Sequence, residues 1–278
     1  MQYNRIKKPV ISILFLLLLF REPLSSNHRF YYTNYEQILS SYVSENGLVD
    51  YYMLQMDRYP LDKFILSLGF LDSTVFSRWT REEKVAFYIN AYNAIVLRIV
   101  IDHYPLRPMR LSSFRFPMNS ILQIGNVFKT KPFNIMGEEL TLDQIENILT
   151  QKLDEPKVRF ALVRGSQSCP PLRNVPYTGE LLYSKLDDQI EKILLNPGFF
   201  FINTMEDVVY ISAILKNVRF NKYGFSPQKR GLLHRSRKRQ ALVHFLSRYV
   251  YDSDRKYLLN SEYQIKFFPM NWTLNDWN

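Results

Sequence analysis

Hydrophobic residues fill nearly every position from residue 85 to residue 101, on all sides of a helix with about 3.6 residues per turn. Thr80 and Glu83 precede this run at the spacing of a capping box, and Pro105 follows it at a position where a helix has to stop. A helix that is apolar all round is buried rather than amphipathic. The pattern therefore predicts a long helix at the centre of the hydrophobic core.

The remaining patterns are shorter and change between the helical period and the strand period. No regular β-α-β alternation is present, so we expect an α+β fold in which amphipathic helices and short β-strands or hairpins surround the buried central helix. Helical spacing predicts helices at residues 33–47, 59–69, 142–153, 178–198, around 239–251 and near Lys256, whereas strand-like spacing predicts strands within residues 127–141, 157–163, 199–215 and 263–269.

The beginning of the chain has the layout of a secretory signal. Arg5, Lys7 and Lys8 precede a run of eleven residues at 10–20 that is apolar apart from Ser12, and Arg21 follows it. An eleven-residue helix is only about half as long as the roughly 30 Å hydrocarbon core of a bilayer. We therefore expect a cleaved signal peptide at residues 1–26 and a single domain at 27–278, with no transmembrane span after cleavage. The protein would then be periplasmic or extracellular, and an uncleaved N-terminal membrane anchor is the alternative.

Charge is concentrated in one part of the chain. Residues 208–251 contain ten Lys or Arg and no Asp or Glu, which accounts for the formal net charge of +10. A surface of one sign attracts anions. We expect it to meet an anionic envelope component or a partner protein rather than nucleic acid, although a solvated basic loop has the same composition. The candidate anion-binding residues are Lys229, Arg230, Arg235, Arg237, Lys238 and Arg239.

The motifs of several common enzyme classes are absent. The chain has no G-x-G-x-x-G, no phosphate-binding G-x-x-x-x-G-K-[ST], no G-x-S-x-G and no H-E-x-x-H. None of its four histidines is paired with another His or with a Cys at metal-ligand spacing. We therefore expect neither a metal site nor a cofactor.

Cys169 is the only cysteine, so no intrachain disulfide can form and we expect a free thiol or an intermolecular bridge. Two interpretations of this residue stay open. A reactive thiol would have its pKa lowered by Arg164 and Arg173, which flank it. A structural thiol would be a small apolar residue of the core.

Catalysis at Cys169 would need further groups. Ser166 and Ser168 are candidate oxyanion donors, and His103, in the last turn of the predicted central helix, is a candidate general base. A histidine at that place more often interacts with the carbonyl end of its own helix.

Two amides interrupt the apolar central helix. Asn90 and Asn93 are three residues apart and share one face. A buried amide without partners costs about 1–3 kcal/mol, so each must form specific hydrogen bonds. They either tie the helix to a neighbouring loop, or line a site and orient a substrate or the loop of Cys169.

Together these segments resemble the domain of unknown function 547 family over residues 30–275. The resemblance rests on the helix motif VAFYINAYNAIVLRIVIDHYP, the LTLDQIENIL segment, the KVRFALVRGSQSCPPLRNVPYT loop and the tail FPMNWTLND. It implies an exported bacterial protein but brings no activity. The matching positions are Asn90, Tyr92, Asn93, His103, Tyr104, Pro105, Glu146, Ser168, Cys169, Pro170, Pro171 and Leu172.

Two departures from the family pattern weaken a catalytic role. Many members have a histidine where this chain has Asn147, and acidic residues where it has Phe220 and Asn221. Asparagine takes up no proton near neutral pH. We therefore expect a non-catalytic binding module for an anionic envelope component or partner protein. The alternative is a cysteine-dependent hydrolase or acyltransferase that uses Cys169, with Glu146 and His103 as the other candidate catalytic residues.

Overall fold

The computed structural model describes residues 30–107, 115–224 and 235–277. The chain divides into two units, residues 1–31 and 32–278, and the fold below is that of the second. The predicted signal peptide at 1–26 and two of the candidate anion-binding residues, Lys229 and Arg230, lie outside the described residues.

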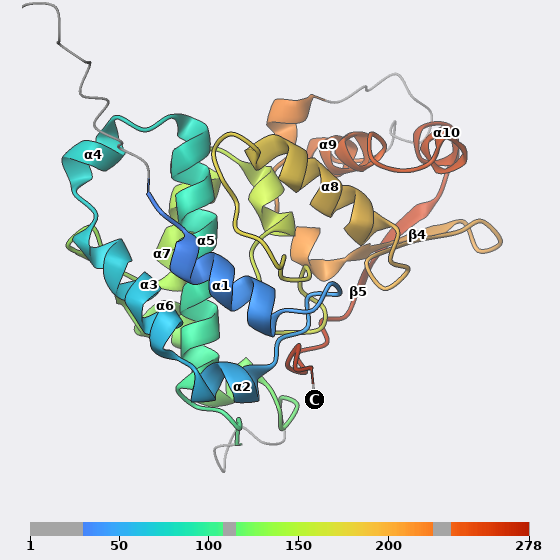
Figure 1. The fold of residues 1–278 in the computed structure, drawn as a ribbon. Helices are drawn as coiled ribbons and strands as arrows, with labels where there is room; N and C mark the ends of the chain where they lie inside the picture. The colour runs from blue at the N-terminus through green and yellow to red at the C-terminus, as the bar shows by residue number, and fades with distance from the viewer. Residues whose placement is uncertain (1–29, 108–114, 225–234, 278) are drawn as a thin grey trace, which may run out of the picture. The chain divides into compact units, whose positions relative to one another are not determined.

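The second unit has the predicted α+β fold, with more helix than strand (Figure 1). The α-helices are α1 (Thr33–Tyr42), α2 (Tyr51–Met56), α3 (Tyr59–Phe70), α4 (Ser73–Ser77), α5 (Arg81–Ile101), α6 (Val127–Thr130), α7 (Leu142–Asn147), α8 (Leu182–Leu194), α9 (Arg237–Leu246) and α10 (Asp252–Asn260). The strands are β1 (Phe133–Ile135), β2 (Glu138–Leu140), β3 (Phe200–Asn203), β4 (Val208–Ser212) and β5 (Gln264–Phe268). Short 3-10 helices are η2 (Ile121–Ile124), η4 (Pro156–Phe160), η5 (Ala213–Leu215) and η6 (Asn221–Tyr223), and η3 (Ile148–Lys152) is a π-helical turn.

Helix α5 is the buried central helix that the sequence predicts. Thr80 and Glu83 form a complete capping box at its start, and every residue from 85 to 97 is buried. The helix packs against α2, α3, α7 and α8 (Figure 1). Among the described residues α5 is also long and apolar enough to cross a bilayer, but its sides are covered by protein, as expected for a core helix.

A second apolar cluster lies between the three-stranded sheet and helices α8, α9 and α10. The strand order is β3-β4-β5; β3 and β4 form the predicted antiparallel hairpin, and β5 pairs with β4 in parallel. The rings of Phe220 and Phe245 stack in this cluster with centroids 4.3 Å apart, and Phe160 packs beside them. Burying each of these large side chains contributes about 1.5–3 kcal/mol.

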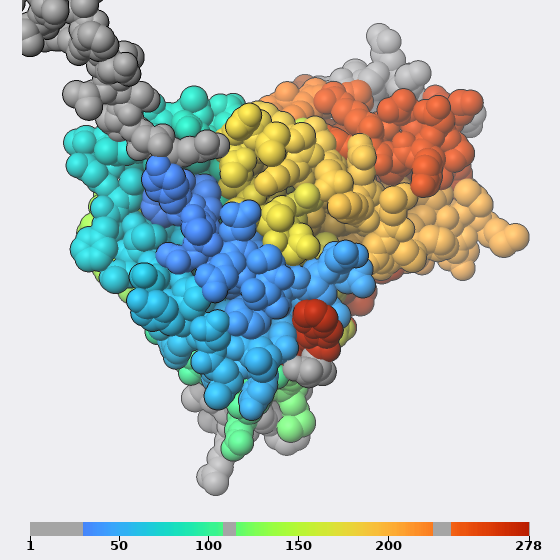
Figure 2. Space-filling view, viewed as in Figure 1, coloured from blue at the N-terminus to red at the C-terminus, as the bar shows by residue number. Residues whose placement is uncertain are grey.

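The end of the chain returns to its beginning. The amide of Val49 donates to the Asn275 carbonyl, and the amide of Trp277 donates to the Val49 carbonyl. In Figure 2 the last residues, in dark red, therefore lie beside the blue residues at the start of the second unit. This return places the tail at residues 270–273 beside the loop that carries Cys169.

Three sequence predictions of local structure are wrong in part. The first helix ends at Tyr42 rather than Gly47, because Val43 pairs with Val49 across a turn. Residues 127–130 form α6 rather than a strand. Residues 157–163 form no strand: Pro156 begins the helix η4, and the buried backbone after it bonds to a side chain instead of a neighbouring strand.

Candidate functional site

Residues 161–177 form an irregular segment whose two ends are held by side chains of α5. Asn93 donates to the Ala161 carbonyl at 2.9 Å and accepts from the Val163 amide at 2.9 Å. Asn90 forms the same pair of bonds with the carbonyl and amide of Tyr177, at 2.7 and 3.0 Å. In each case the side-chain amide takes the place of a neighbouring β-strand as the hydrogen-bond partner of the buried backbone. The two asparagines therefore attach helix α5 to the loop.

Cys169 lies within this held segment and is buried, with 4% of its surface exposed. The Ser166 hydroxyl donates to its sulfur at 3.2 Å, and the Cys169 amide donates to the Ser166 carbonyl at 3.0 Å. Burial raises the pKa of the Cys169 thiol above its ordinary value, although the Ser166 hydrogen bond and the charge of Arg164 oppose this. The arrangement favours the protonated thiol, which is a poor nucleophile.

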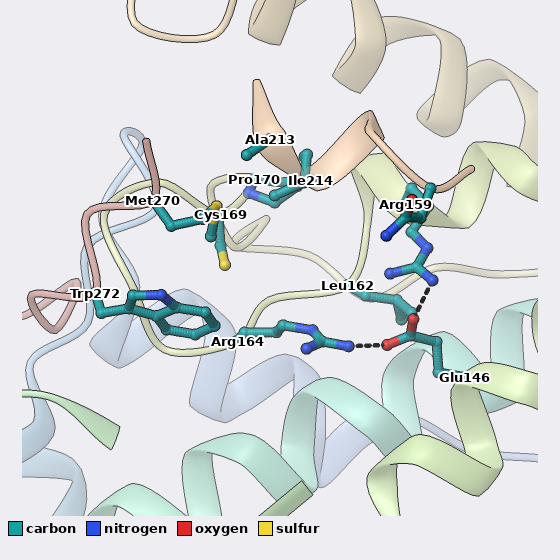
Figure 3. Close-up of a pocket in the computed structure, with 11 residues that line it drawn as sticks. Glu146, Arg159, Leu162, Arg164, Cys169, Pro170, Ala213, Ile214, Met270 and Trp272 are labelled. Atoms are coloured by element: carbon teal, nitrogen blue, oxygen red, sulfur yellow. Dashed lines mark hydrogen bonds and ion pairs between the residues drawn. The ribbon is translucent and has the colours of Figure 1, made fainter. Parts of the chain in front are cut away.

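The C-terminal tail covers the loop. The Ser168 hydroxyl accepts from the Asn271 amide at 2.7 Å, and the Gln167 amide donates to the Thr273 carbonyl at 2.9 Å. These bonds bring Met270 and Trp272 next to Cys169 (Figure 3).

The thiol forms part of the wall of a cavity of about 270 Å³ (Figure 3). Glu146 lies in the same cavity, so the structure brings together two of the three candidate catalytic residues. The lining residues are Glu146, Arg159, Leu162, Arg164, Cys169, Pro170, Ala213, Ile214, Asn217, Met270 and Trp272. We refer to this space as the Cys169 pocket.

Glu146, on α7, is buried and its carboxylate is fully engaged. One oxygen pairs with Arg159 and the other with Arg164, as the dashed lines in Figure 3 show. The Arg164 guanidinium also lies over the ring of Phe128, 5.0 Å from its centroid. Both carboxylate oxygens are therefore occupied by charge-assisted ion pairs with arginines, and neither is directed at the thiol.

Three of the other candidate site residues, His103, Arg173 and Ser168, interact with groups other than Cys169 and Glu146. His103 lies just after α5, where its Nδ1 is 2.8 Å from the Ile99 carbonyl oxygen, and it does not line the Cys169 pocket. The histidine therefore contacts the end of its own helix and is not placed to act as a base for the thiol. Arg173 pairs with Asp188 on α8 and also lies outside the pocket lining, so Arg164 is the arginine beside the thiol. Ser168 is bonded to the tail.

The sequence model of the family described as protein of unknown function, DUF547, matches residues 76–194. The chain contains a DUF547 domain. The matched segment contains Glu146, Arg159, Arg164 and Cys169, whereas the η5 residues and the tail complete the pocket from outside it. No curated protein and no solved structure matches the chain.

In this DUF547 protein a second cavity adjoins the Cys169 pocket. It has a volume of about 450 Å³ and shares Arg159 and Asn217 with the pocket. Its remaining lining residues are Thr150, Gln151, Asp154, Pro156, Val218, Arg219, Asn221 and Lys222. Most of these side chains are polar, and Arg219 and Lys222 belong to the acid-free part of the sequence.

The described basic residues at the start of α9 divide into two groups. Arg235 is half-buried on the ring of Tyr263, 4.1 Å from its centroid, and donates to the Tyr263 carbonyl, so its contact in the structure is with the protein itself. Arg237, Lys238 and Arg239 form the first turn of α9, and the Lys238 ammonium reaches the Asn217 side chain at 3.5 Å. Within the described ranges, Arg237 and Arg239 have no ion-pair partner.

Sequence reasoning missed several pocket residues of this DUF547 protein. Arg159 lies among the apolar residues of the run at 157–163, two positions after Lys157, and a cation within such a run is a signal of a buried partner. Met270 and Trp272 belong to the tail motif that supports the family resemblance. Asn217 and Ile214 carry no comparable signal, because their position depends on how β4 leads into η5.

Proposed function

We propose that this DUF547 protein is a non-catalytic binding module for an anionic partner, and that its sequence directs it out of the cell to the envelope. The binding surface comprises the Cys169 pocket, the adjoining cavity and the first turn of α9. The proposal rests on one observation, that both carboxylate oxygens of Glu146 are paired with arginines.

Glu146 is the one acidic side chain in the Cys169 pocket, and both of its oxygens are occupied by arginines. Two guanidinium groups against one carboxylate leave a net positive charge that is held in a fixed position. Since each arginine carries five N–H donors, donors remain for an anion after the pairing with Glu146.

The surrounding charges support the same function. Arg219 lines the adjoining cavity, and Lys238, which lies between Arg237 and Arg239 in the first turn of α9, contacts the Asn217 side chain. The positive end of the α9 dipole adds to their field instead of neutralising it. Such a surface raises the local concentration of anions and accelerates their encounter.

The test is the salt dependence of binding to a simple polyanion, inorganic polyphosphate. We expect the affinity of the intact protein to fall at least about tenfold between 50 and 300 mM NaCl, because screening weakens exposed charge interactions. Reversal of Arg237 and Arg239 to Glu should remove most of the binding at low salt. The matched control reverses two exposed lysines elsewhere, Lys63→Glu on α3 and Lys256→Glu on α10, and should change the affinity less than twofold. A flat salt response, or equal effects of both double variants, would refute the proposal.

The alternative is a cysteine-dependent hydrolase or acyltransferase. One observation favours it: Cys169 lines the same pocket as Arg164 and has a Ser166 hydroxyl at 3.2 Å. The burial of the thiol and the engagement of Glu146 oppose it. Treatment of the folded protein with iodoacetamide at pH 6 distinguishes the two functions. Rapid alkylation at Cys169 would favour the enzyme, whereas a thiol that reacts only after unfolding in urea would favour the binding module.

A further inference from the structure

The two cavities meet at Arg159 and Asn217, which line both of them. We refer to the two adjoining cavities together as the Arg159 groove, with Cys169 and Trp272 at one end and Lys222 at the other. Its two ends differ in chemistry, and that difference indicates what it binds.

The Cys169 end presents apolar and polar surface in nearly equal shares, and its apolar share is the larger of the two ends. Ala213, Ile214 and Leu162 contribute aliphatic surface, and the tail adds Met270 and Trp272 (Figure 3). Methionine and tryptophan adapt well to apolar groups of varied shape. A space of about 270 Å³ with these walls is of the right order for one large side chain of a partner, and too small for a long acyl chain.

The Lys222 end carries side-chain amides and cations. Gln151, Asn217 and Asn221 line it, and each amide presents both a donor and an acceptor. This combination matches the alternating N–H and C=O groups of an extended peptide, whereas a phosphate chain offers acceptors alone. Among the described residues, the side chains of Gln151 and Asn221 have no hydrogen-bond partner that would compete for this role.

The charge of the groove favours an acidic occupant. Its lining includes four cations, Arg159, Arg164, Arg219 and Lys222, and two carboxylates, Glu146 and Asp154. Lys222 is paired with Glu155 outside the lining, so the excess positive charge lies on the three arginines. Arg159 is held by Glu146, yet its Nε is buried and has no hydrogen-bond partner among the described residues. The part of the Arg159 guanidinium that lines the groove can donate to a carboxylate there, as expected for charge-assisted recognition, because the side chain is 27% exposed.

We propose that the Arg159 groove binds an extended acidic segment of a partner protein, with one aromatic or large aliphatic side chain of that segment in the Cys169 pocket. The carboxylates of the segment lie against Arg159 and Arg219, and its backbone pairs with the amides at the Lys222 end. This inference rests on the proposed anion-binding function and names the class of partner.

The test compares two fluorescein-labelled peptides of nine residues in fluorescence anisotropy with the intact protein. Both contain Glu and Asp at eight positions, and the central residue is Phe in one and Gly in the other. We expect the Phe peptide to bind at least tenfold more tightly. Binding of the Phe peptide should also change the fluorescence emission of Trp272. The substitution Trp272→Phe should abolish that change.

A pair of methionine variants locates the binding. Met270→Glu places a charge in the Cys169 end of the groove and should abolish the preference for Phe. Met205→Glu is the control, because Met205 lies in the β3–β4 turn and is 97% exposed. Arg219→Glu should weaken the binding of both peptides about tenfold. Because this substitution lies outside the Cys169 end of the groove, it still tests the proposal if Met270→Glu fails to fold.

The outcomes separate this inference from the proposed function. Equal affinities for the two peptides, or equal effects of Met270→Glu and Met205→Glu, would overturn the acidic-segment inference while salt-dependent binding of polyphosphate still supports an anion-binding module. Binding of polyphosphate but of neither peptide would overturn it as well. If the protein binds no polyanion of any kind, the proposed function itself fails.

Discussion

Asn90 and Asn93 lie one turn apart on α5 and hold opposite ends of the segment that carries Cys169. Each side chain forms two hydrogen bonds with a buried backbone, one as donor and one as acceptor. The rigid core helix therefore fixes the position of a loop that has no regular structure of its own. The chemistry of the Cys169 pocket depends on this attachment.

Substitution Asn93→Ala should destabilise the protein through this attachment. It leaves the Ala161 carbonyl and the Val163 amide buried without partners, and each such group costs about 1–3 kcal/mol. Urea unfolding monitored by circular dichroism measures the loss. Asn147→Ala removes the same side chain from an exposed position on α7 and should stay within about 0.5 kcal/mol of the parent. Similar losses for both variants would show that the two-point attachment contributes little.

Gly47 supports the loop from the opposite side. Its φ is +77°, and a Cβ placed there would lie 2.4 Å from the Pro171 Cβ and 2.6 Å from the Leu172 nitrogen. Gly137, at the β1–β2 turn, has a similar φ of +80° but nothing within 4 Å of a Cβ. A substitution at Gly137 therefore tests backbone strain alone, whereas the same substitution at Gly47 adds steric overlap with the loop.

We expect Gly137→Ala to lower the free energy of unfolding by about 1–2 kcal/mol through the left-handed backbone alone. Gly47→Ala should lose a further 1–3 kcal/mol or so, because the backbone of residues 171–172 has to move. It should also expose the Cys169 thiol, which labelling of the folded protein by a thiol reagent would detect. If the two variants are equally stable and equally unreactive, the close packing of Gly47 on this loop is unimportant.

Lys157 is a buried cation between α8 and the segment after α9. Its ammonium lies 2.5 Å from an Asp187 oxygen, and the rings of Tyr183, Tyr223 and Tyr249 surround it with centroids at 5.5–5.6 Å. Its side chain is only 9% exposed, whereas that of Asp187 is 40% exposed, so the cation is buried but the pair is partly screened by solvent.

Lys157→Ala should therefore destabilise the protein by about 2–3 kcal/mol, through the lost cation–π contacts and the lost packing of a buried side chain, while Asp187 keeps its hydrogen bond from Tyr249. Lys192 is the matched control, since it pairs with the neighbouring Asp188 at 3.2 Å but is 64% exposed. Lys192→Ala should cost no more than about 1 kcal/mol, as is usual for surface pairs. Thermal and urea unfolding of the two variants provide the comparison, and equal losses would contradict the role of burial.

Local sequence patterns predicted the parts of this fold that depend on neighbours in the chain. The capping box at Thr80 and Glu83, the buried α5 and the β3–β4 hairpin are set by residues a few positions apart. The role of the two asparagines in attaching α5 to a loop was also predictable, because a buried amide needs hydrogen-bond partners even when they are distant in the sequence.

The pocket was less predictable, because it forms between distant segments. Asn271 follows Ser168 by 103 residues, and nothing local indicates that the tail bonds to this loop. The run at 157–163 has an apolar pattern that a strand and a buried helical turn share, so periodicity alone could not distinguish them. As a result, Arg159 was not recognised as the residue that joins Glu146 to the adjoining cavity.

The raised pKa of Cys169 makes the stability of the protein depend on pH in a predictable direction. Burial disfavours the thiolate in the folded state, whereas an unfolded thiol ionises with a pKa of about 8.5. A group whose folded pKa is the higher one contributes its full stability below the unfolded pKa, and that contribution is lost as pH rises toward the folded pKa. The free energy of unfolding should therefore fall above pH 8.5, by at most about 1.4 kcal/mol per pH unit from this one proton.

Cys169→Ala removes the ionisable group and should remove this part of the pH dependence. Urea unfolding of both proteins at several values between pH 7 and 9.5, with a reductant present, measures the two slopes. The variant is expected to be less stable at pH 7 because a buried side chain is truncated, and the gap should narrow as the pH rises. The range stops at 9.5 because buried tyrosines such as Tyr92 also have a raised pKa, and unfolded tyrosines ionise near pH 10 in both proteins. Parallel curves would show that the thiol ionises equally well in the folded and unfolded states, which would remove the main physical argument against a reactive Cys169.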